Sequence, residues 1–258
     1  MKALIVIFAK LRYLYRYMNI YRYRIRLFLC FFAGFMVILP FFSCAARING
    51  SLSADGSAAL SVSVSLEPRI TSLIQRLSAV GGQADAPILD GTIIAQSMSE
   101  SGIVMALFRN TAPAAIEGTI QISDVSRFLT FGDRGGFIDF EQSGSGGSFA
   151  VTINRYNGPI ILEILSPEIA AYLNALMAPL ATGEELTKAE YLELVGSIYN
   201  RAISDEIAGA RVRASIDFPG TVTSVNGGTF SGRRADFDIL LLDLLVLETP
   251  VNYEVQWR

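Results

Sequence analysis

The sequence contains no histidine and only two cysteines among its 258 residues. The lack of histidine excludes a Ser-His-Asp triad, a Cys-His pair and histidine-ligated zinc or haem. Two cysteines are too few for a zinc ribbon, a four-cysteine iron–sulfur cluster or a framework of disulfides. Lysine is also scarce, since Lys188 is the only one beyond residue 10, and there is no Gly-x4-Gly-Lys phosphate loop. Any catalysis would therefore depend on carboxylates, tyrosines, arginines and hydroxyls.

Charge is distributed very unevenly along the chain. All seven basic residues before position 30 occur without a single acid, whereas the residues from Cys44 onward include 14 basic and 24 acidic side chains, a formal charge of −10. Nucleic-acid binding depends on basic side chains that neutralise phosphates. We therefore expect no nucleic acid among the partners of this protein.

The first 43 residues have the layout of an export signal. Basic residues precede the apolar run 27–42, an order that keeps the positive charges in the cytoplasm while the run enters the membrane. The run is short for a spanning helix of about 20 residues and contains Pro40. We predict that residues 1–43 are a signal peptide or membrane anchor and that 44–258 are one exported domain. Because the basic segment is long, either translation starts at Met18 or the additional residues are tolerated.

The apolar run ends in Pro40-Phe41-Phe42-Ser43-Cys44. This ending resembles the lipobox of bacterial lipoproteins, in the loose form known from spirochaetes. Cys44 follows the small residue Ser43, while Phe41 stands where the family usually has leucine. The resemblance implies cleavage between Ser43 and Cys44 and attachment of lipid, palmitate included, to Cys44. It also implies a lipid anchor in the cell membrane or outer membrane, with the domain on the non-cytoplasmic, periplasmic or external side. Two alternatives stay open: cleavage without lipid, or an uncleaved anchor over residues 20–42.

From Ala46 onward the sequence predicts an α+β fold, mainly an antiparallel sheet with several helices packed on it. Alternating apolar residues and serines at 58–66 are typical of a strand with one buried face. Apolar spacings of three and four after Pro68 are typical of a helix, which Gly81-Gly82 would end. At 241–247 the pattern does not distinguish helix from strand. Further strands are predicted at 47–53, 102–109, 115–122, 137–141, 148–153, 210–217, 220–225, 235–240 and 251–257, and further helices at 91–98, 166–178 and 187–208.

A second resemblance lies near the C-terminus. The segment Phe218-Pro219-Gly220-Thr221-Val222-Thr223-Ser224-Val225-Asn226-Gly227, followed by Asp236-Phe237-Asp238-Ile239, is similar to the C-terminal strands of LppM-like bacterial lipoproteins. The resemblance implies an α/β surface or periplasmic domain with a suspected role in binding lipids or glycolipids. Phe237 stands where we expect a tryptophan in that family, and no functional residue is transferred.

Two groups of acidic residues are candidates for chemistry. Asp236 and Asp238 are two positions apart, so on a strand both point to one face, where they could bind calcium or act as acid and base. We interpret them instead as the solvated face of a strand. Four glutamates cluster near a predicted helix start, where the helix dipole explains their presence without a metal. These are Glu184, Glu185, Glu190 and Glu193.

Four arginines form a candidate basic patch. If their strands pair, the patch would be suited to phospholipid head groups, although Asp217, Asp236 and Asp238 are close in sequence. The four are Arg211, Arg213, Arg233 and Arg234.

We draw two functional hypotheses from these patterns. The first is a membrane-anchored, non-catalytic binding or structural domain of the cell envelope, with a lipid, an apolar ligand or an envelope protein as partner. It is motivated by Cys44 and by the surplus of apolar residues at 160–180 and 239–247. The alternative is an envelope hydrolase, which requires two carboxylates roughly 5–10 Å apart. Its candidates are Asp139, Glu141, Asp236 and Asp238, and neither hypothesis requires a metal or cofactor.

Overall fold

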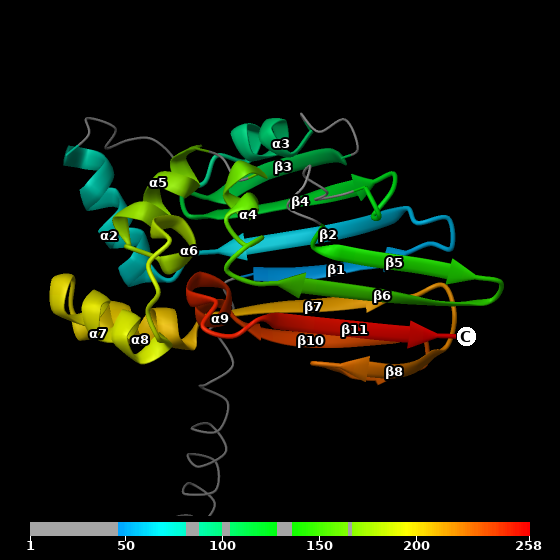
Figure 1. Cartoon of the computed structure of the whole chain (residues 1–258). Coiled ribbons are helices and arrows are strands. Elements are labelled where there is room, and N and C mark those ends of the chain that lie inside the picture. Colours follow the sequence, from blue (N-terminus) through cyan, green and yellow to red (C-terminus); the bar gives the residue numbers. More distant parts are fainter. Residues whose placement is uncertain (1–45, 81–87, 100–103, 128–135, 165–166) are drawn as a thin grey trace, which may run out of the picture. The chain divides into compact units, whose positions relative to one another are not determined.

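Two sheets form the centre of the structure, a computed structural model that describes residues 46–80, 88–99, 104–127, 136–164 and 167–258 (Figure 1). The larger sheet has seven strands in the order β3-β4-β2-β1-β7-β10-β9, and the smaller has four in the order β5-β6-β11-β8. The strands of the large sheet are β1 (Ala46–Leu52), β2 (Ala58–Ser65), β3 (Val104–Ala112), β4 (Ala115–Ile122), β7 (Arg211–Asp217), β9 (Thr229–Ser231) and β10 (Arg234–Leu240). Those of the small sheet are β5 (Ile138–Ser143), β6 (Gly146–Ile153), β8 (Val222–Asn226) and β11 (Val251–Trp257).

The predicted α+β class is confirmed, with two differences. Strand β1 pairs antiparallel with β2 but parallel with β7, so the first strand lies inside the large sheet rather than at its edge. The second sheet was not predicted as a separate layer, because alternation identifies a strand but not its partner.

The space between the two sheets is filled by one apolar core. Alternate residues of the large sheet, such as Ile120 and Phe237, pack there with Val255 and Trp257 of the small sheet. The Trp257 ring centroid lies 5.3 Å from that of Phe218. Since side chains alternate along a strand, the intervening residues of the large sheet point away from this core and form an outer face.

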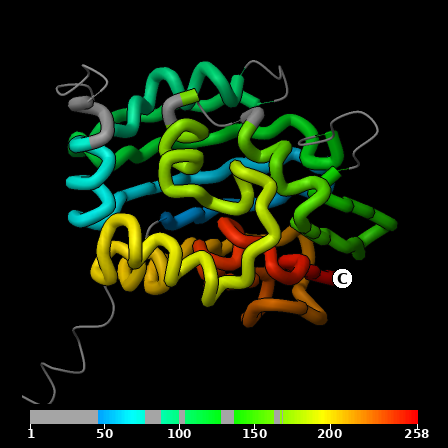
Figure 2. Tube along the Cα trace, turned by 60° about the vertical axis from the view of Figure 1, so that its left-hand side comes forward, coloured from blue at the N-terminus to red at the C-terminus, as the bar shows by residue number. Residues whose placement is uncertain are grey.

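The helices gather mainly at the end of the large sheet where β1 begins (Figures 1 and 2). A second core joins them through residues such as Leu73, Tyr191 and Ile207. The apolar segment that the sequence left unassigned forms a short helix, which ends at Leu247 with a φ of 48°. The helices are α2 (Pro68–Val80), α3 (Gly91–Ser99), α4 (Ile160–Ile164), α5 (Pro167–Ala175), α6 (Pro179–Thr182), α7 (Lys188–Ile198), α8 (Arg201–Gly209) and α9 (Leu241–Val246).

The single helix predicted over 187–208 is wrong in one respect, because the chain breaks at Tyr199 and Asn200. The Asn200 side chain accepts a hydrogen bond from the Ile203 amide at 3.0 Å and so caps a new helix, α8. The start of α7 was predicted correctly: Thr187 and Glu190 form a reciprocal capping box. The break lets α7 and α8 fold back on each other and enclose the helical core. The helix predicted to run to Ala178 ends earlier, at Ala175, and its predicted cap Ser166 lies outside the described residues.

Candidate functional site

An apolar pocket of about 150 Å³ opens at the end of the large sheet where β1 begins. Its walls come from helices α2, α5, α8 and α9 and from the residues where strands β2 and β7 meet the helical layer. We call this the apolar pocket. Its lining includes Leu66, Ile70, Leu173, Ile207, Ala210 and Leu241.

The α2 wall exists because of helical spacing in the sequence. Pro68 starts the helix, and Ile70, Leu73 and Ile74 then fall on its buried side. On the facing helix α8, Ile203 and Ile207 are four residues apart and buried. Apolar stripes from two helices therefore meet, and the pocket is the space left between them.

A carboxylate at the rim of the apolar pocket joins α2 to α8. The Glu206 side chain, 12% exposed, accepts a hydrogen bond from the Ile70 amide at 3.1 Å and lies 3.3 Å from the Arg69 guanidinium. It thus satisfies a free amide at the start of α2, where the helix dipole favours negative charge. The pocket combines an apolar interior with one ion pair at its edge.

Two tyrosines of the α7 segment hold the α5 wall in place. The buried Tyr191 hydroxyl donates to the Leu176 carbonyl at 3.2 Å, and the Tyr199 hydroxyl donates to the Ala175 carbonyl. Both carbonyls lie at the end of α5, where a helix leaves such groups unpaired. Burial, and secondarily the neighbouring Tyr199, raises the pKa of Tyr191 above its usual range. The phenol therefore stays protonated, as its donor role requires.

The strand register places the apolar pocket beside the start of the described chain. Ala46 pairs with Val64 of β2 and with Val212 of β7. The pocket residue Leu66 follows Val64 by two positions, and the pocket residue Ala210 precedes Val212 by two positions. In the sequence, Cys44 likewise precedes Ala46 by two positions. The described chain therefore begins at Ala46, beside the strand ends that lead to the pocket. Ser43, Cys44 and the predicted signal 1–43 lie outside the described residues.

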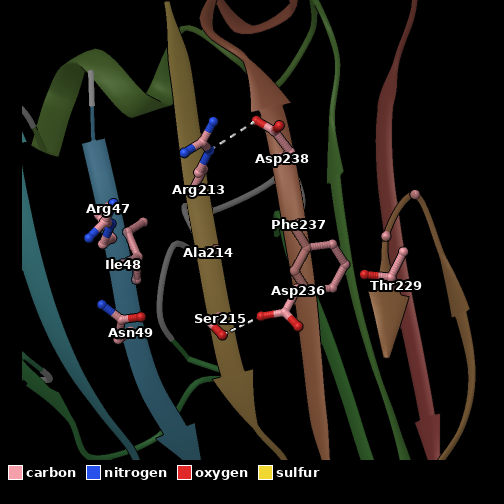
Figure 3. Close-up of a pocket in the computed structure, with 12 residues that line it drawn as sticks. Arg47, Ile48, Asn49, Arg213, Ala214, Ser215, Thr229, Asp236, Phe237 and Asp238 are labelled. Atoms are coloured by element: carbon pink, nitrogen blue, oxygen red, sulfur yellow. Dashed lines mark hydrogen bonds and ion pairs between the residues drawn. The ribbon is translucent and has the colours of Figure 1, made fainter. Parts of the chain in front are cut away.

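A second, open hollow lies on the outer face of the large sheet (Figure 3). This groove of about 560 Å³ is lined on β1, β7 and β10 by charged and amide side chains. Asp238 lies 3.9 Å from Arg213, and the Ser215 hydroxyl donates to Asp236. Asp236 and Asp238 thus lie on the solvent face, as the strand interpretation predicts, while Phe237 packs into the core.

The four carboxylates of the hydrolase hypothesis do not come together. Phe140 of β5 packs into the core between the sheets, so its exposed neighbours Asp139 and Glu141 point out from the small sheet. Asp236 and Asp238 point out from the large sheet. The two pairs therefore face opposite sides of the molecule.

The four candidate arginines do not form one patch. Strands β7 and β10 do pair, but they run antiparallel, so Arg234 lies opposite Asp217 while Arg211 lies opposite Leu240. Arg234 forms two hydrogen bonds with Asp217, at 2.9 and 3.0 Å, and Arg233 donates to the Phe218 carbonyl. The arginines consequently divide between the two ends of β7.

Sequence inspection missed Arg47, which lies directly opposite Arg213 in the parallel pair of β1 and β7. Only the parallel pairing brings these two side chains together. No local sequence pattern around Arg47 indicates that its partner is Arg213. Arg47, Arg211 and Arg213 share the outer face, and we call them the arginine triad.

Contacts with neighbouring residues explain two of the four glutamates near α7 without a metal. Glu190 belongs to the capping box, and its hydrogen bonds with Thr187, the backbone one above all, lower its pKa. Glu185 lies 3.7 Å from Arg155. Among the described residues no group of three or more potential metal ligands occurs. Within the same residues, no helix combines the length and hydropathy needed to cross a bilayer.

No family model matches the chain, and no curated protein matches its sequence. Among solved structures, the chain is similar to the folded domain of LppM from Mycobacterium tuberculosis, determined by NMR. The TM-score is 0.35 and the identity 12%, over 84% of this chain and 92% of that one. A bacterial lipoprotein domain is therefore a structural neighbour, at a similarity too low to establish a shared fold or function.

Proposed function

We propose that this protein is an exported lipoprotein of a bacterial cell envelope, anchored at Cys44, whose domain is non-catalytic and holds part of a lipid in the apolar pocket. The domain lies on the non-cytoplasmic side of the cell membrane or outer membrane. The observation that carries the proposal is the position of the apolar pocket, whose walls Leu66 and Ala210 lie beside the strand end at Ala46, two positions after Cys44 in the sequence.

The dimensions of the apolar pocket fit a short alkyl segment rather than a whole lipid. Its volume of about 150 Å³ corresponds to about five water molecules at about 30 Å³ each. Apolar cavities of this size stay dry and accept small hydrocarbons. The ion pair of Arg69 and Glu206 at the rim supplies a polar boundary, so an amphipathic molecule matches the site better than a fully apolar one.

The same geometry favours a binding role over catalysis. A glycosidase-type site needs two facing carboxyl groups in a cleft, and the candidate pairs on β5 and β10 point away from each other. The carboxylate at the pocket rim, Glu206, is occupied by the α2 amides and Arg69. Its hydrogen bonds are those of a helix cap.

The anchor is tested by the intact mass and detergent partitioning of the expressed full chain. We expect loss of the residues before Cys44, added acyl mass and partition into the detergent phase, all abolished by Cys44→Ala. The matched control is Cys30→Ala, which removes the only other cysteine and should leave the product unchanged. An unmodified full-length mass with membrane retention in both variants would make residues 20–42 a permanent anchor instead.

The apolar pocket is tested with cis-parinaric acid, a fluorescent fatty acid, added to the full chain in lipid nanodiscs and competed with palmitate. Leu173→Trp places a larger ring in the pocket wall and should abolish saturable binding beyond that of empty nanodiscs. Leu194→Trp, on α7 away from the pocket lining, should retain it. Equal binding by all three chains would contradict the ligand role and leave a structural role with an envelope-protein partner.

A further inference from the structure

The outer face of the large sheet is open to solvent along its whole width. Outward residues of β1, β2, β4 and β10 are exposed, whereas their inward neighbours pack in the core. Arg47, Asn49 and Ser51 on β1 follow this pattern. No described helix or strand covers this face, so it is available to something outside the domain.

Positive charge on the outer face collects at the end where β1 begins. Arg47 and Arg213 lie opposite each other, and Arg211 lies two residues away on the same side of β7. Among the described residues, the side chains of Arg47 and Arg211 have neither an ion-pair nor a hydrogen-bond partner, and that of Arg213 has only the 3.9 Å contact with Asp238. At the other end of β7, Arg234 is fully engaged by Asp217.

This local excess contrasts with the rest of the exported segment. Residues 44–258 carry a formal charge of −10, and they contain one lysine and thirteen arginines. Three neighbouring arginines that share a single ion pair, in so acidic a domain, are therefore a local feature that overall composition does not explain. Guanidinium groups bind phosphate through two parallel hydrogen bonds.

The short separation of Arg47 from Cys44 favours a membrane surface as the partner of the arginine triad. Arg47 follows Cys44 by three residues, which span at most about 11 Å. Whether the chain is held by lipid on Cys44 or by the apolar run 27–42, Arg47 is therefore kept near a bilayer surface. Each basic side chain near an anionic surface strengthens binding roughly fivefold.

We infer that the arginine triad binds the phosphates of anionic phospholipid head groups and turns the outer face of the large sheet, at its β1 end, toward the bilayer. The inference rests on the membrane-anchor part of the proposed function. Asn49 and Ser215, one step further along the same face, add hydrogen-bonding groups beside the arginines.

Arginine footprinting tests this inference on the full, unmutated chain. The protein is reconstituted in nanodiscs of phosphatidylcholine alone or with 30% phosphatidylglycerol, and the rate at which phenylglyoxal modifies each arginine is followed by peptide mass. We expect Arg47 and Arg213 to react at least threefold more slowly on the anionic discs. Arg76 on α2 and Arg201 on α8, both exposed and both outside the sheet, should react at unchanged rates.

A double variant separates the triad from general charge. In Arg47→Gln/Arg213→Gln, protection of the remaining Arg211 by anionic discs should fall at least twofold. The control Arg76→Gln/Arg201→Gln removes the same charge from the helices, and Arg211 should keep its protection there. Equal protection of Arg211 in both variants would overturn the inference.

Two further outcomes also contradict it. Unchanged rates at Arg47 and Arg213 would show no head-group contact, and equal slowing at all arginines would show only a general surface effect. Protection on neutral discs by 10 mM glycerol 3-phosphate to the same extent as by anionic lipid would identify a site for soluble phosphate esters instead. The Cys44→Ala mass measurement reports separately on the anchor, so failure of the anchor and failure of the triad are distinguishable.

Discussion

Replacing Tyr191 by phenylalanine should change stability with opposite sign at neutral and at alkaline pH. Tyr191 is fully buried, and its hydroxyl donates to the Leu176 carbonyl. Tyr191→Phe removes this hydrogen bond and leaves a buried carbonyl unpaired. Net hydrogen-bond contributions of about 0.5–1.5 kcal/mol predict a free energy of unfolding lower by about 1 kcal/mol at pH 7–8.

The alkaline behaviour follows from the pKa of Tyr191, which burial raises above its ordinary value. In the unfolded chain the phenol loses its proton near pH 10, while in the folded protein it keeps it. Above pH 10 the unfolded state therefore binds fewer protons, and the wild type loses about 1.4 kcal/mol per pH unit from this group. Tyr191→Phe lacks that loss, so the two stability curves should cross between about pH 10 and 11.

Urea unfolding of the full chain in a non-ionic detergent, followed by far-UV circular dichroism from pH 7 to 11.5, measures this crossing. The control is Tyr156→Phe, whose side chain is 69% exposed and should follow the wild type within about 0.5 kcal/mol. Parallel curves for wild type and Tyr191→Phe over the whole range would refute the reasoning about burial. Equal stability at pH 7 would refute the reasoning about the hydrogen bond.

Three further substitutions test the elements around the site. Thr187→Ala should lower the free energy of unfolding by about 1 kcal/mol, while Thr187→Ser, which keeps the capping oxygen, should restore most of it in urea titrations. Gly118→Ala should destabilise by about 1–3 kcal/mol, because its Cβ would lie 2.2 Å from a carbonyl oxygen of the next strand. Gly196→Ala on α7, where the nearest atom to the added Cβ is 3.6 Å away, should instead stabilise the protein by about 0.5–1 kcal/mol. If the melting temperatures of the Gly118 and Gly196 variants moved in the same direction, the expected contrast between the two sites would be wrong. Phe218→Ala should lower the free energy of unfolding by about 3–5 kcal/mol, because Phe218 is 1% exposed and packs beside Trp257. The fluorescence of Trp257 measures the shift of the urea midpoint. A decrease below about 1 kcal/mol would contradict the role of this packing.

Local signals in the sequence predicted most elements but not their partners. The serine-alternating pattern identified β2, and the Thr187 capping box identified the start of α7, because both depend on neighbouring residues. The break at Asn200 was missed because apolar spacing continues across it, and only the cap at Ile203 reveals a new helix. The sheet order depends on contacts that no short window contains.

The candidate site was predictable only in part. The apolar surplus at 160–180 and 239–247 indicated a cavity, and α5, α6 and α9 lie there, but α2 and α8 supply other walls of the apolar pocket. The carboxylates of β10 were correctly interpreted as a solvated face. The arginine triad could not be predicted, because Arg47 reaches Arg213 only through the parallel pair.

That parallel pair also dictates when the sheet can form. Ala46 lies beside Val212, so the central strand of the large sheet has to wait for a partner made 166 residues later. Contacts this distant in sequence slow folding, because a long loop must close before they contribute. If the chain is exported from its N-terminus, as we propose, β1 stays unpaired on one side until β7 has followed. Such a delay favours passage in an unfolded form, and it leaves a strand edge with unpaired backbone groups that a holding chaperone would need to cover.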